Sequence, residues 1–203
     1  MSHNAAQKAR ARRRAADLAK RQRRAKRRFI WVIVGLVVVS AVTAMMLTSR
    51  PDSSDDVRAT PGFTLTDTTG VSHTLSQHRG ENVLLYFSEG AGCQSCLVQM
   101  GEIEKNAEQF AEQGVTVLPI VMNTKEQITH DMRLNGVTTP FLLDDGTVSQ
   151  EYDTLGKGMH AGLPGHSFVL IDKSGHQRWY GEYPSMWLSP QDLLDEVRSR
   201  LDA

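Results

Sequence analysis

Both cysteines of the chain lie in one short stretch, GCQSC at residues 92–96. A strand-like apolar run at 82–87 precedes the pair, and a helix-like run from Leu97 to about Gln113 follows it. Two cysteines at positions i and i+3 on the first turn of a helix can form a disulfide without backbone movement. The free N–H groups and the dipole at that helix end stabilise a thiolate, the reactive form of cysteine. Cys93 and Cys96 therefore predict a dithiol that cycles with a disulfide.

Two other interpretations of Cys93 and Cys96 remain open. The pair could be half of a metal site, but a four-cysteine zinc site needs a second pair, which this sequence lacks. It could also be a static structural disulfide, although closing so small a loop constrains the unfolded chain little. The spacing favours redox chemistry over both.

The formal charge of zero conceals an uneven distribution of charge along the chain. Residues 1–28 contain twelve Lys or Arg and one acid, Asp17, whereas the remainder contains eleven basic and twenty-two acidic residues. The main body is therefore acidic, and we expect no nucleic-acid partner. The 203 residues are enough for one domain of about 150 residues with appendages.

Residues 29–47, FIWVIVGLVVVSAVTAMML, form an uncharged apolar segment. At 1.5 Å per residue, nineteen residues roughly span a ~30 Å hydrocarbon core. A cleaved signal peptide is the alternative, but its charged region is normally short, whereas 28 residues precede this run. We therefore predict a single-pass signal anchor that contacts the lipid bilayer. The positive-inside rule would keep the basic tail, 1–28, in the cytoplasm and the rest of the chain outside the cell membrane.

The sequence after the anchor divides into a polar linker and one folded domain. Residues 48–61, TSRPDSSDDVRATP, predict a flexible linker, and residues 62–203 predict an α/β domain. In chain order we expect a hairpin at 63–75, buried strands at 82–87 and 115–121 joined by a helix at 97–113, a helix at 125–135, a strand at 141–143, a helical turn at 148–155, a hairpin at 167–180 and a final helix from Pro190.

The order of these elements resembles the thioredoxin-like superfamily. The closest branch is the redoxin group, which includes alkyl hydroperoxide reductase/thiol-specific antioxidant domains and membrane-anchored thiol–disulfide oxidoreductases. Four segments carry the resemblance: FTLTDTTGVSHTL, ENVLLYFSEGAGCQSC, PFLLDDGTVSQEYDTLG and SFVLIDKSGHQRWYGEY. It implies a thioredoxin-like fold, with a central mixed sheet flanked by helices, preceded here by one transmembrane helix.

The resemblance also implies roles for single residues. Cys93 looks like the exposed attacking thiol and Cys96 like the resolving thiol that expels the partner. Family members place a cis-proline opposite the dithiol, just before the strand expected at 167–171. Pro164 is the candidate, with Pro140 as the fallback. Because two residues separate Pro164 from that strand, either the loop bulges or His166 occupies the position, so we expect Pro164 and His166 to bind substrate.

The leading functional hypothesis is a membrane-tethered thiol–disulfide oxidoreductase outside the cytoplasm. Its partners would be protein thiols and disulfides together with an unidentified electron donor or acceptor. No cofactor and no metal are expected at its site. The sequence departs from the family at two points. Gly92 stands where an aromatic residue usually precedes the first cysteine, and the nearest candidate for the usual buried acid is Glu89, which lies in the loop.

Two alternative functions come from the same resemblance. Peroxidases of the branch carry Pro-x-x-x-Thr-x-x-Cys, but Tyr86 and Gly90 stand at the proline and threonine positions. Anchored copper chaperones use a cysteine pair spaced one residue more widely and a distant histidine, for which His160 and His166 are the candidates. Both alternatives depart from their family pattern at these residues.

Overall fold

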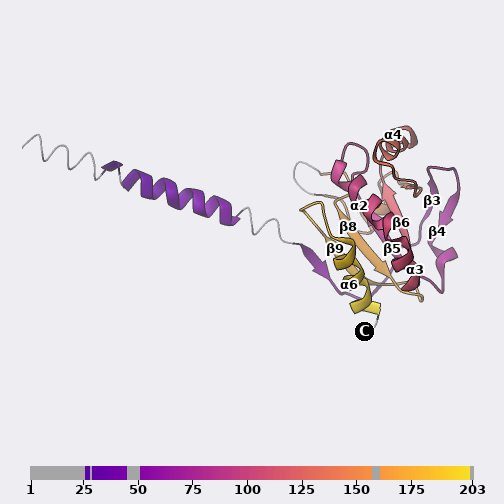
Figure 1. Cartoon of the computed structure of the whole chain (residues 1–203). Coiled ribbons are helices and arrows are strands. Elements are labelled where there is room, and N and C mark those ends of the chain that lie inside the picture. The colour runs from indigo at the N-terminus through magenta and orange to yellow at the C-terminus, as the bar shows by residue number, and fades with distance from the viewer. Residues whose placement is uncertain (1–25, 28, 45–50, 157–160, 202–203) are drawn as a thin grey trace, which may run out of the picture. The chain divides into compact units, whose positions relative to one another are not determined.

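The structure is a computed structural model that describes residues 26–27, 29–44, 51–156 and 161–201 (Figure 1). The chain forms two units, Met1–Thr48 and Ser49–Ala203. In the first unit residues 26–27 and 29–44 are helical, and the apolar side chains of this helix are exposed. None of the helices within the described ranges is long and apolar enough to cross a membrane. Residues 1–25 and 28 of the expected tail, and 45–47 of the expected anchor, lie outside those ranges.

The second unit is built on one mixed sheet, as the resemblance implied. Within the described residues its strand order is β1-β9-β8-β5-β6-β7-β3-β4, with β2 also paired with β9. The strands are β1 (Asp52–Ser54), β2 (Arg58–Ala59), β3 (Thr64–Asp67), β4 (Ser72–Thr74), β5 (Asn82–Phe87), β6 (Val115–Val121), β7 (Leu142–Leu143), β8 (Ser167–Ile171) and β9 (His176–Glu182). The buried strand β5 lies at the centre, parallel to β6 and antiparallel to β8.

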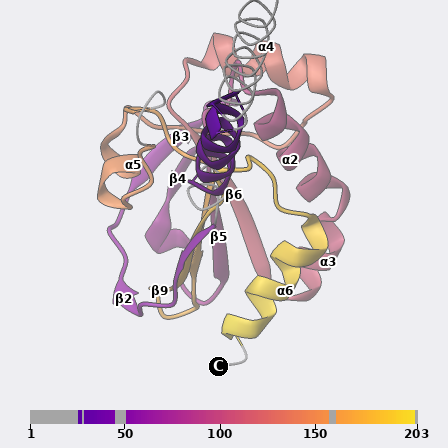
Figure 2. The ribbon, with the colours of Figure 1, turned by 90° about the vertical axis from the view of Figure 1, so that its left-hand side faces the viewer.

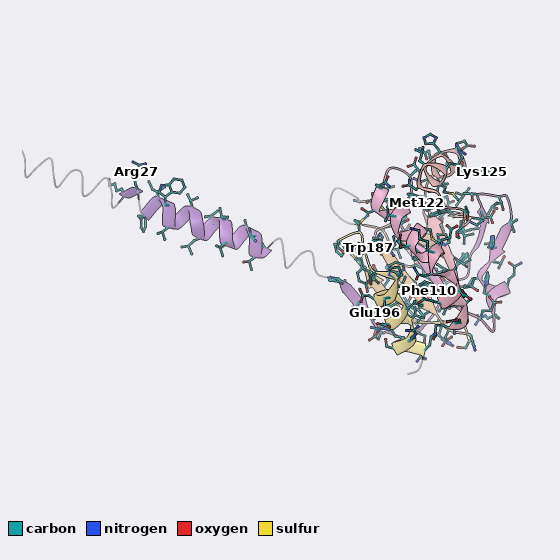
Figure 3. The ribbon with its side chains drawn as sticks, viewed as in Figure 1. Arg27, Phe110, Met122, Lys125, Trp187 and Glu196 are labelled. Atoms are coloured by element: carbon teal, nitrogen blue, oxygen red, sulfur yellow. A yellow bond between two sulfur atoms is a disulfide. The ribbon has the colours of Figure 1, made fainter. Side chains whose placement is uncertain are left out.

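Helices cover both faces of this sheet. They are the 3-10 helix η1 (Leu75–His78) and the α-helices α2 (Gln94–Lys105), α3 (Ala107–Glu112), α4 (Lys125–Asn135), α5 (Thr147–Glu151) and α6 (Pro190–Leu201). Figure 2 shows α2, α3 and α6 on one side of the sheet and α5 on the other. Helix α4 follows β6 and begins at Lys125, at one end of the domain (Figure 3).

The sequence predicted most elements, and one helix differs. The region 97–113 was expected to be a single helix but forms α2 and α3, separated at Asn106. The side-chain amide of Asn106 donates to the carbonyl oxygen of Glu102 (2.8 Å), and its backbone N–H donates to Ile103 instead. A side chain that takes over a helical acceptor in this way interrupts the regular hydrogen-bond ladder.

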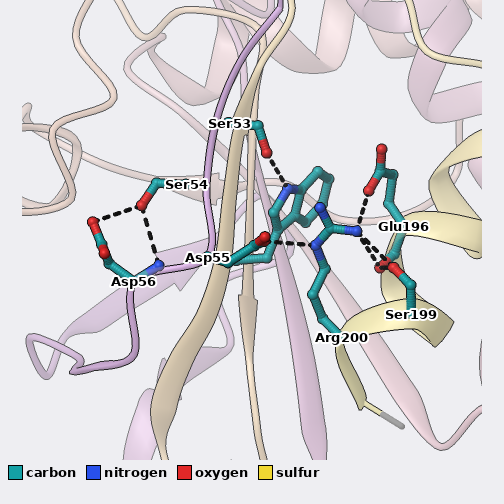
Figure 4. Close-up of polar contacts among 8 residues, drawn as sticks. Ser53, Ser54, Asp55, Asp56, Glu196, Ser199 and Arg200 are labelled. Carbon is teal, nitrogen blue, oxygen red and sulfur yellow. Dashed lines mark hydrogen bonds and ion pairs between the residues drawn. The ribbon is translucent and has the colours of Figure 1, made fainter. Parts of the chain in front are cut away.

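The expected linker was the larger error. Residues 48–50 lie outside the described residues, but β1 and β2 pair with β9 and so belong to the sheet. The indole N–H of Trp179 donates to Ser53 Oγ (3.0 Å), and Arg200 on α6 pairs with Asp55 (2.9 Å), as Figure 4 shows. The prediction of a flexible tether was therefore wrong over residues 52–59. A polar edge strand is held mainly by backbone hydrogen bonds, which composition does not reveal.

Candidate active site

The two cysteines lie where β5 leads into α2. Cys93 is the N-cap residue of α2, and its sulfur is joined to that of Cys96 in a disulfide, with the Cα atoms 5.3 Å apart. The Cys96 backbone N–H donates to Cys93 Sγ (3.2 Å), because the first N–H groups of a helix have no acceptor within the helix. The side chain of Cys96 is fully buried, whereas Cys93 is partly exposed. Only the first sulfur is therefore accessible to another molecule.

Glycines shape the loop in front of Cys93. Gly90 and Gly92 have φ angles of +68° and +88°, in the left-handed region that favours glycine. A Cβ at Gly90 would come within 2.1 Å of Asn123 Oδ1. These conformations explain why Gly92 replaces the aromatic residue usual before the first cysteine.

Side chains from the region of α4 hold this loop. Asn123 Oδ1 accepts a hydrogen bond from the Ala91 backbone N–H, and Asp131 Oδ2 accepts one from the Gly92 N–H, both at 2.8 Å. Beside them is an open hollow of about 540 Å³. It is lined by Ala91, Gly92, Glu126, Gln127, His130 and Asp131.

A buried polar group lies behind the dithiol. Tyr86 on β5 places its hydroxyl 3.2 Å from the Cys96 carbonyl oxygen and 3.2 Å from His166 Nδ1, while His166 Nε2 lies 3.3 Å from Gln99 Oε1. Gln99 Oε1 also accepts the backbone N–H of Leu188, which fixes the orientation of its amide. His166 Nε2 must therefore carry the proton that Gln99 accepts, and Nδ1 is left to accept from Tyr86.

Burial controls the ionisation of this group. Burial lowers the pKa of His166 to about 4, so the imidazole is neutral at pH 7. Burial also raises the pKa of Tyr86 above its ordinary value, so its hydroxyl keeps its single proton. That proton can serve either His166 or the Cys96 carbonyl, but not both fully at once.

The structure places the two expected substrate-binding residues differently from the prediction. His166 is only 1% exposed and does not present its side chain to a substrate. Pro164 forms a β-bridge with Leu155, so the backbone before β8 pairs with residues 154–156. Every peptide bond in the described ranges is trans, so neither Pro164 nor the fallback Pro140 is a cis-proline. His166, directly before β8, is turned inward and contacts Gln99 on α2.

The geometry does not assemble the copper site considered above. His160 lies outside the described residues, and His166 is occupied by Tyr86 and Gln99. Among the residues that the structure describes, no three His, Cys, Asp or Glu side chains are grouped to hold a metal.

Comparison with known proteins agrees with the fold. Residues 58–179 match the AhpC/TSA family, which is more than half of the chain. The chain belongs to the AhpC/TSA family. It is 31% identical over 113 residues to the thiol-disulfide oxidoreductase ResA of Geobacillus kaustophilus, a match that covers 44% of this chain and 64% of ResA. It is 27% identical over 120 residues to the chloroplastic peroxiredoxin Q of Populus jackii, covering 58% of this chain and 55% of that protein.

Solved structures give the same fold. The Mycobacterium tuberculosis peroxidoxin BcpB superposes with a TM-score of 0.58 at 19% identity, covering 71% of this chain and 94% of that one. The Plasmodium vivax 2-Cys peroxiredoxin gives 0.63 at 20% identity, covering 71% and 95%. At these identities the likeness shows the fold alone. Both curated relatives are matched over less than two-thirds of their own length.

Within the AhpC/TSA family, this chain departs from the peroxidase motif at two structurally fixed positions. Tyr86, at the proline position, is fully buried, and its hydroxyl lies within hydrogen-bond distance of the Cys96 carbonyl oxygen. Gly90, at the threonine position, has a backbone conformation and a contact with Asn123 that exclude a larger side chain without rearrangement. The site therefore lacks the hydroxyl that would bind a peroxide in those enzymes.

Sequence reasoning missed the residues that surround the dithiol. Asn123 and Asp131 lie 30 or more residues from Cys93, and Gln99 lies within the helix that follows it. The two glycines around Ala91 were the one available signal, because exposed backbone N–H groups in a tight loop need acceptors from elsewhere. Nothing in the sequence indicated which side chains would supply them.

Proposed function

We propose that this AhpC/TSA-family chain is a membrane-tethered thiol–disulfide oxidoreductase that acts outside the cytoplasm through Cys93 and Cys96. The observation that carries the proposal is the unequal exposure of the two bonded sulfurs at the start of α2. An exposed first thiol can reach a partner disulfide, and a buried second thiol can act only on the first. The similarity to ResA supports the same chemistry.

The reaction follows from this arrangement. In the reduced protein, the Cys93 thiolate attacks one sulfur of a partner disulfide, and the other partner sulfur leaves as a thiolate that takes up a proton. The Cys96 thiol then loses its proton and attacks Cys93 Sγ. That step forms the Cys93–Cys96 disulfide and releases the second partner thiol. Two electrons pass to the partner, and an external thiol donor restores the dithiol; the reverse sequence would oxidise a partner.

The protein contributes stabilisation of the attacking group. The Cys96 N–H that points at Cys93 Sγ would remain directed at a thiolate there, and the positive end of the twelve-residue helix α2 acts in the same sense. The first turn of α2 contains no acidic residue to oppose it.

The central test uses two single variants. Cys93→Ser should abolish reduction of a protein disulfide such as that of insulin, whereas Cys96→Ser should retain the first step and accumulate a mixed disulfide that gel electrophoresis detects. Ser95→Ala, between the two cysteines, is the matched control and should keep activity. If the Cys93→Ser protein reduced insulin like the parent, the proposal would be wrong.

The tether and its orientation are proposed on the sequence. The support is the nineteen-residue uncharged segment at 29–47, flanked on one side by the strongly basic residues 1–28. A protease added to intact cells should remove the domain of a full-length protein that carries a carboxyl-terminal tag. Protection of the tag in intact cells, with digestion after lysis, would place the domain inside and overturn this part.

A thiol-dependent peroxidase is the second candidate, favoured by the similarity to peroxiredoxin Q. Cys93 would then attack a peroxide oxygen, form a sulfenic acid and release water or an alcohol, and Cys96 would resolve the sulfenic acid as a disulfide with loss of water. Because Gly90 and Tyr86 replace the peroxide-binding residues, we expect slow turnover. Stopped-flow oxidation by hydrogen peroxide measures it, and a rate comparable to that of a dedicated peroxiredoxin would favour this candidate.

A further inference from the structure

Three side chains from residues 123–135 contact the residues on both sides of Cys93. Asn123 accepts from the Ala91 N–H, Asp131 accepts from the Gly92 N–H, and Asn135 Oδ1 accepts from the side-chain amide of Gln94. Asn135 in turn donates to the carbonyl oxygen of Asp131 (2.9 Å), which links these two residues of α4, whereas Asn123 precedes the helix. Asp131 is the charged member of this set.

We propose that Asp131 is a positioning residue for the dithiol, whose carboxylate fixes Gly92 and lowers the fraction of Cys93 present as thiolate, and that it thereby biases the couple toward acting as a reductant. This deepens the proposed function and rests on it. It also assigns a preferred direction of electron flow, from this chain to its partner.

The sign follows from the charges of the two redox states. A carboxylate near Cys93 repels a thiolate, which exists only in the reduced protein, and has no comparable effect on the uncharged disulfide. The reduced state is therefore raised in free energy relative to the oxidised state, and the couple becomes more reducing. The N–H of Cys96 acts in the opposite sense, so the two contacts oppose each other at one sulfur.

The size of the effect follows from distance. Asp131 Oδ2 lies 2.8 Å from the Gly92 nitrogen. Since Cys93 is the next residue, standard bond lengths put its sulfur within about 10 Å of the carboxylate. At about 10 Å Coulomb's law gives about a twofold change in thiolate fraction with the dielectric of water and about a 16-fold change with an effective dielectric of about 20 near a protein surface.

Other titratable groups lie around the loop. Glu126 and His130 on α4 line the same hollow, Glu89 lies in the loop itself, and His166 is buried behind Cys96. The backbone N–H groups of Ala91 and Gly92 donate to Asn123 and Asp131, and of these two acceptors Asp131 carries the charge. Among the described residues, the recorded ion pairs join no Lys, Arg or His to Asp131.

The test uses the full-length protein in a Cys96→Ser background, where Cys93 is the only thiol. Asp131→Asn keeps an acceptor for the Gly92 N–H and removes the charge. Asn123→Asp keeps the acceptor for Ala91 and adds a charge on the other side of the loop. Glu126→Gln removes a charge from the same hollow without touching the loop. The rate of iodoacetamide alkylation is measured from pH 5 to pH 10.

We expect Asp131→Asn to be alkylated about two- to 16-fold faster than the parent at neutral pH, with its pH midpoint shifted down, and Asn123→Asp to be slower, with its midpoint shifted up. Glu126→Gln should change the rate less than Asp131→Asn does. With both cysteines present, Asp131→Asn should equilibrate with glutathione at a less reducing ratio.

Unchanged alkylation in both Asp131→Asn and Asn123→Asp would overturn the inference, as would equal changes in the same direction, which would indicate a purely structural role. Failure of the proposed function would look different. The parent would then not reduce insulin, whatever the order of alkylation rates. The two failures are thus separable in one set of proteins.

Discussion

Tyr86 and Phe87 are neighbours on β5, yet they belong to opposite faces of the sheet and to different environments. Tyr86 lies in the core cluster that includes Cys96, Leu97 and residues of α6, whereas Phe87 lies in the cluster beneath the opening hairpin and α5. Both side chains are fully buried.

The two faces differ in what they bury near β5. On the Tyr86 side, the buried polar side chains of Gln99 and His166 connect to the first turn of α2. On the Phe87 side, the contacts of Phe87 are apolar or aromatic, including the ring of Tyr152 at 5.6 Å. One face therefore supports the dithiol with directional hydrogen bonds, and the other supplies stability by packing.

The largest expected effect is a loss of stability caused by a substitution on the apolar face, at Phe87. Phe87→Ala should lower the free energy of unfolding by about 3–5 kcal/mol, because a buried aromatic side chain is replaced by a cavity. Urea unfolding of the full-length protein measures this loss. The rate of Cys93 alkylation in the folded protein should stay at the parent value. Phe87→Leu leaves a smaller cavity, so its free energy of unfolding should lie between those of the parent and Phe87→Ala. A large change in the alkylation rate of Phe87→Ala would contradict the separate roles of the two faces.

The next effect is the pH dependence of stability that His166, on the face of Tyr86, produces. The pKa of His166 is about 4 in the folded protein, against about 6.5 when unfolded. Between these values the unfolded state binds more protons, so stability is fully present above about pH 6.5 and is lost as the pH falls toward 4. From pH 7 to pH 5 this one group should remove about 2 kcal/mol.

Urea midpoints at pH 7 and pH 5 measure that loss, with His166→Gln as the comparison. The glutamine variant cannot titrate, so its stability should fall by about 2 kcal/mol less over the same interval. Asp67, a buried carboxylate, should contribute little to the loss between pH 7 and pH 5. Burial alone would raise its pKa, but hydrogen bonds from Thr69, His73 and Val71 hold it far below the usual range, so its own contribution is lost mainly at lower pH. Equal pH dependence of stability in the parent and the variant would show that His166 does not cause the loss.

A smaller effect tests how the polar face reaches the dithiol. Tyr86→Phe removes the hydroxyl that lies between His166 and the Cys96 carbonyl, and should cost about 1 kcal/mol. In a double-mutant cycle with His166→Gln, the two losses should not be additive, because the residues share one proton. Additive losses would show that the two side chains act independently.

The parts of this molecule that sequence predicted are those set by local pattern. The apolar run of β5 indicated a strand buried on both faces, and the helix expected at 125–135 has the bounds of α4. The long-range contacts were not predictable in this way. Burial of His166 depends on its packing against Tyr86 and Gln99, and the contact of Asp131 with Gly92 depends on where α4 packs. The cysteine spacing indicated the reacting atoms but not the residues that control them.

The smallest expected effect lies at the edge of the sheet, where residues 52–59 join the face that carries the dithiol. Arg200 pairs with the exposed Asp55 and lies over the ring of Trp179, 5.4 Å from its centroid (Figure 4). Asp55→Asn should cost no more than about 1 kcal/mol in urea unfolding, because an exposed ion pair is screened by solvent, and the cost should shrink in 1 M salt. Arg200→Ala should cost more, since it also removes the contact with the indole ring. If Asp55→Asn cost as much as Arg200→Ala, the ion pair rather than stacking on Trp179 would hold the edge strand to the dithiol face.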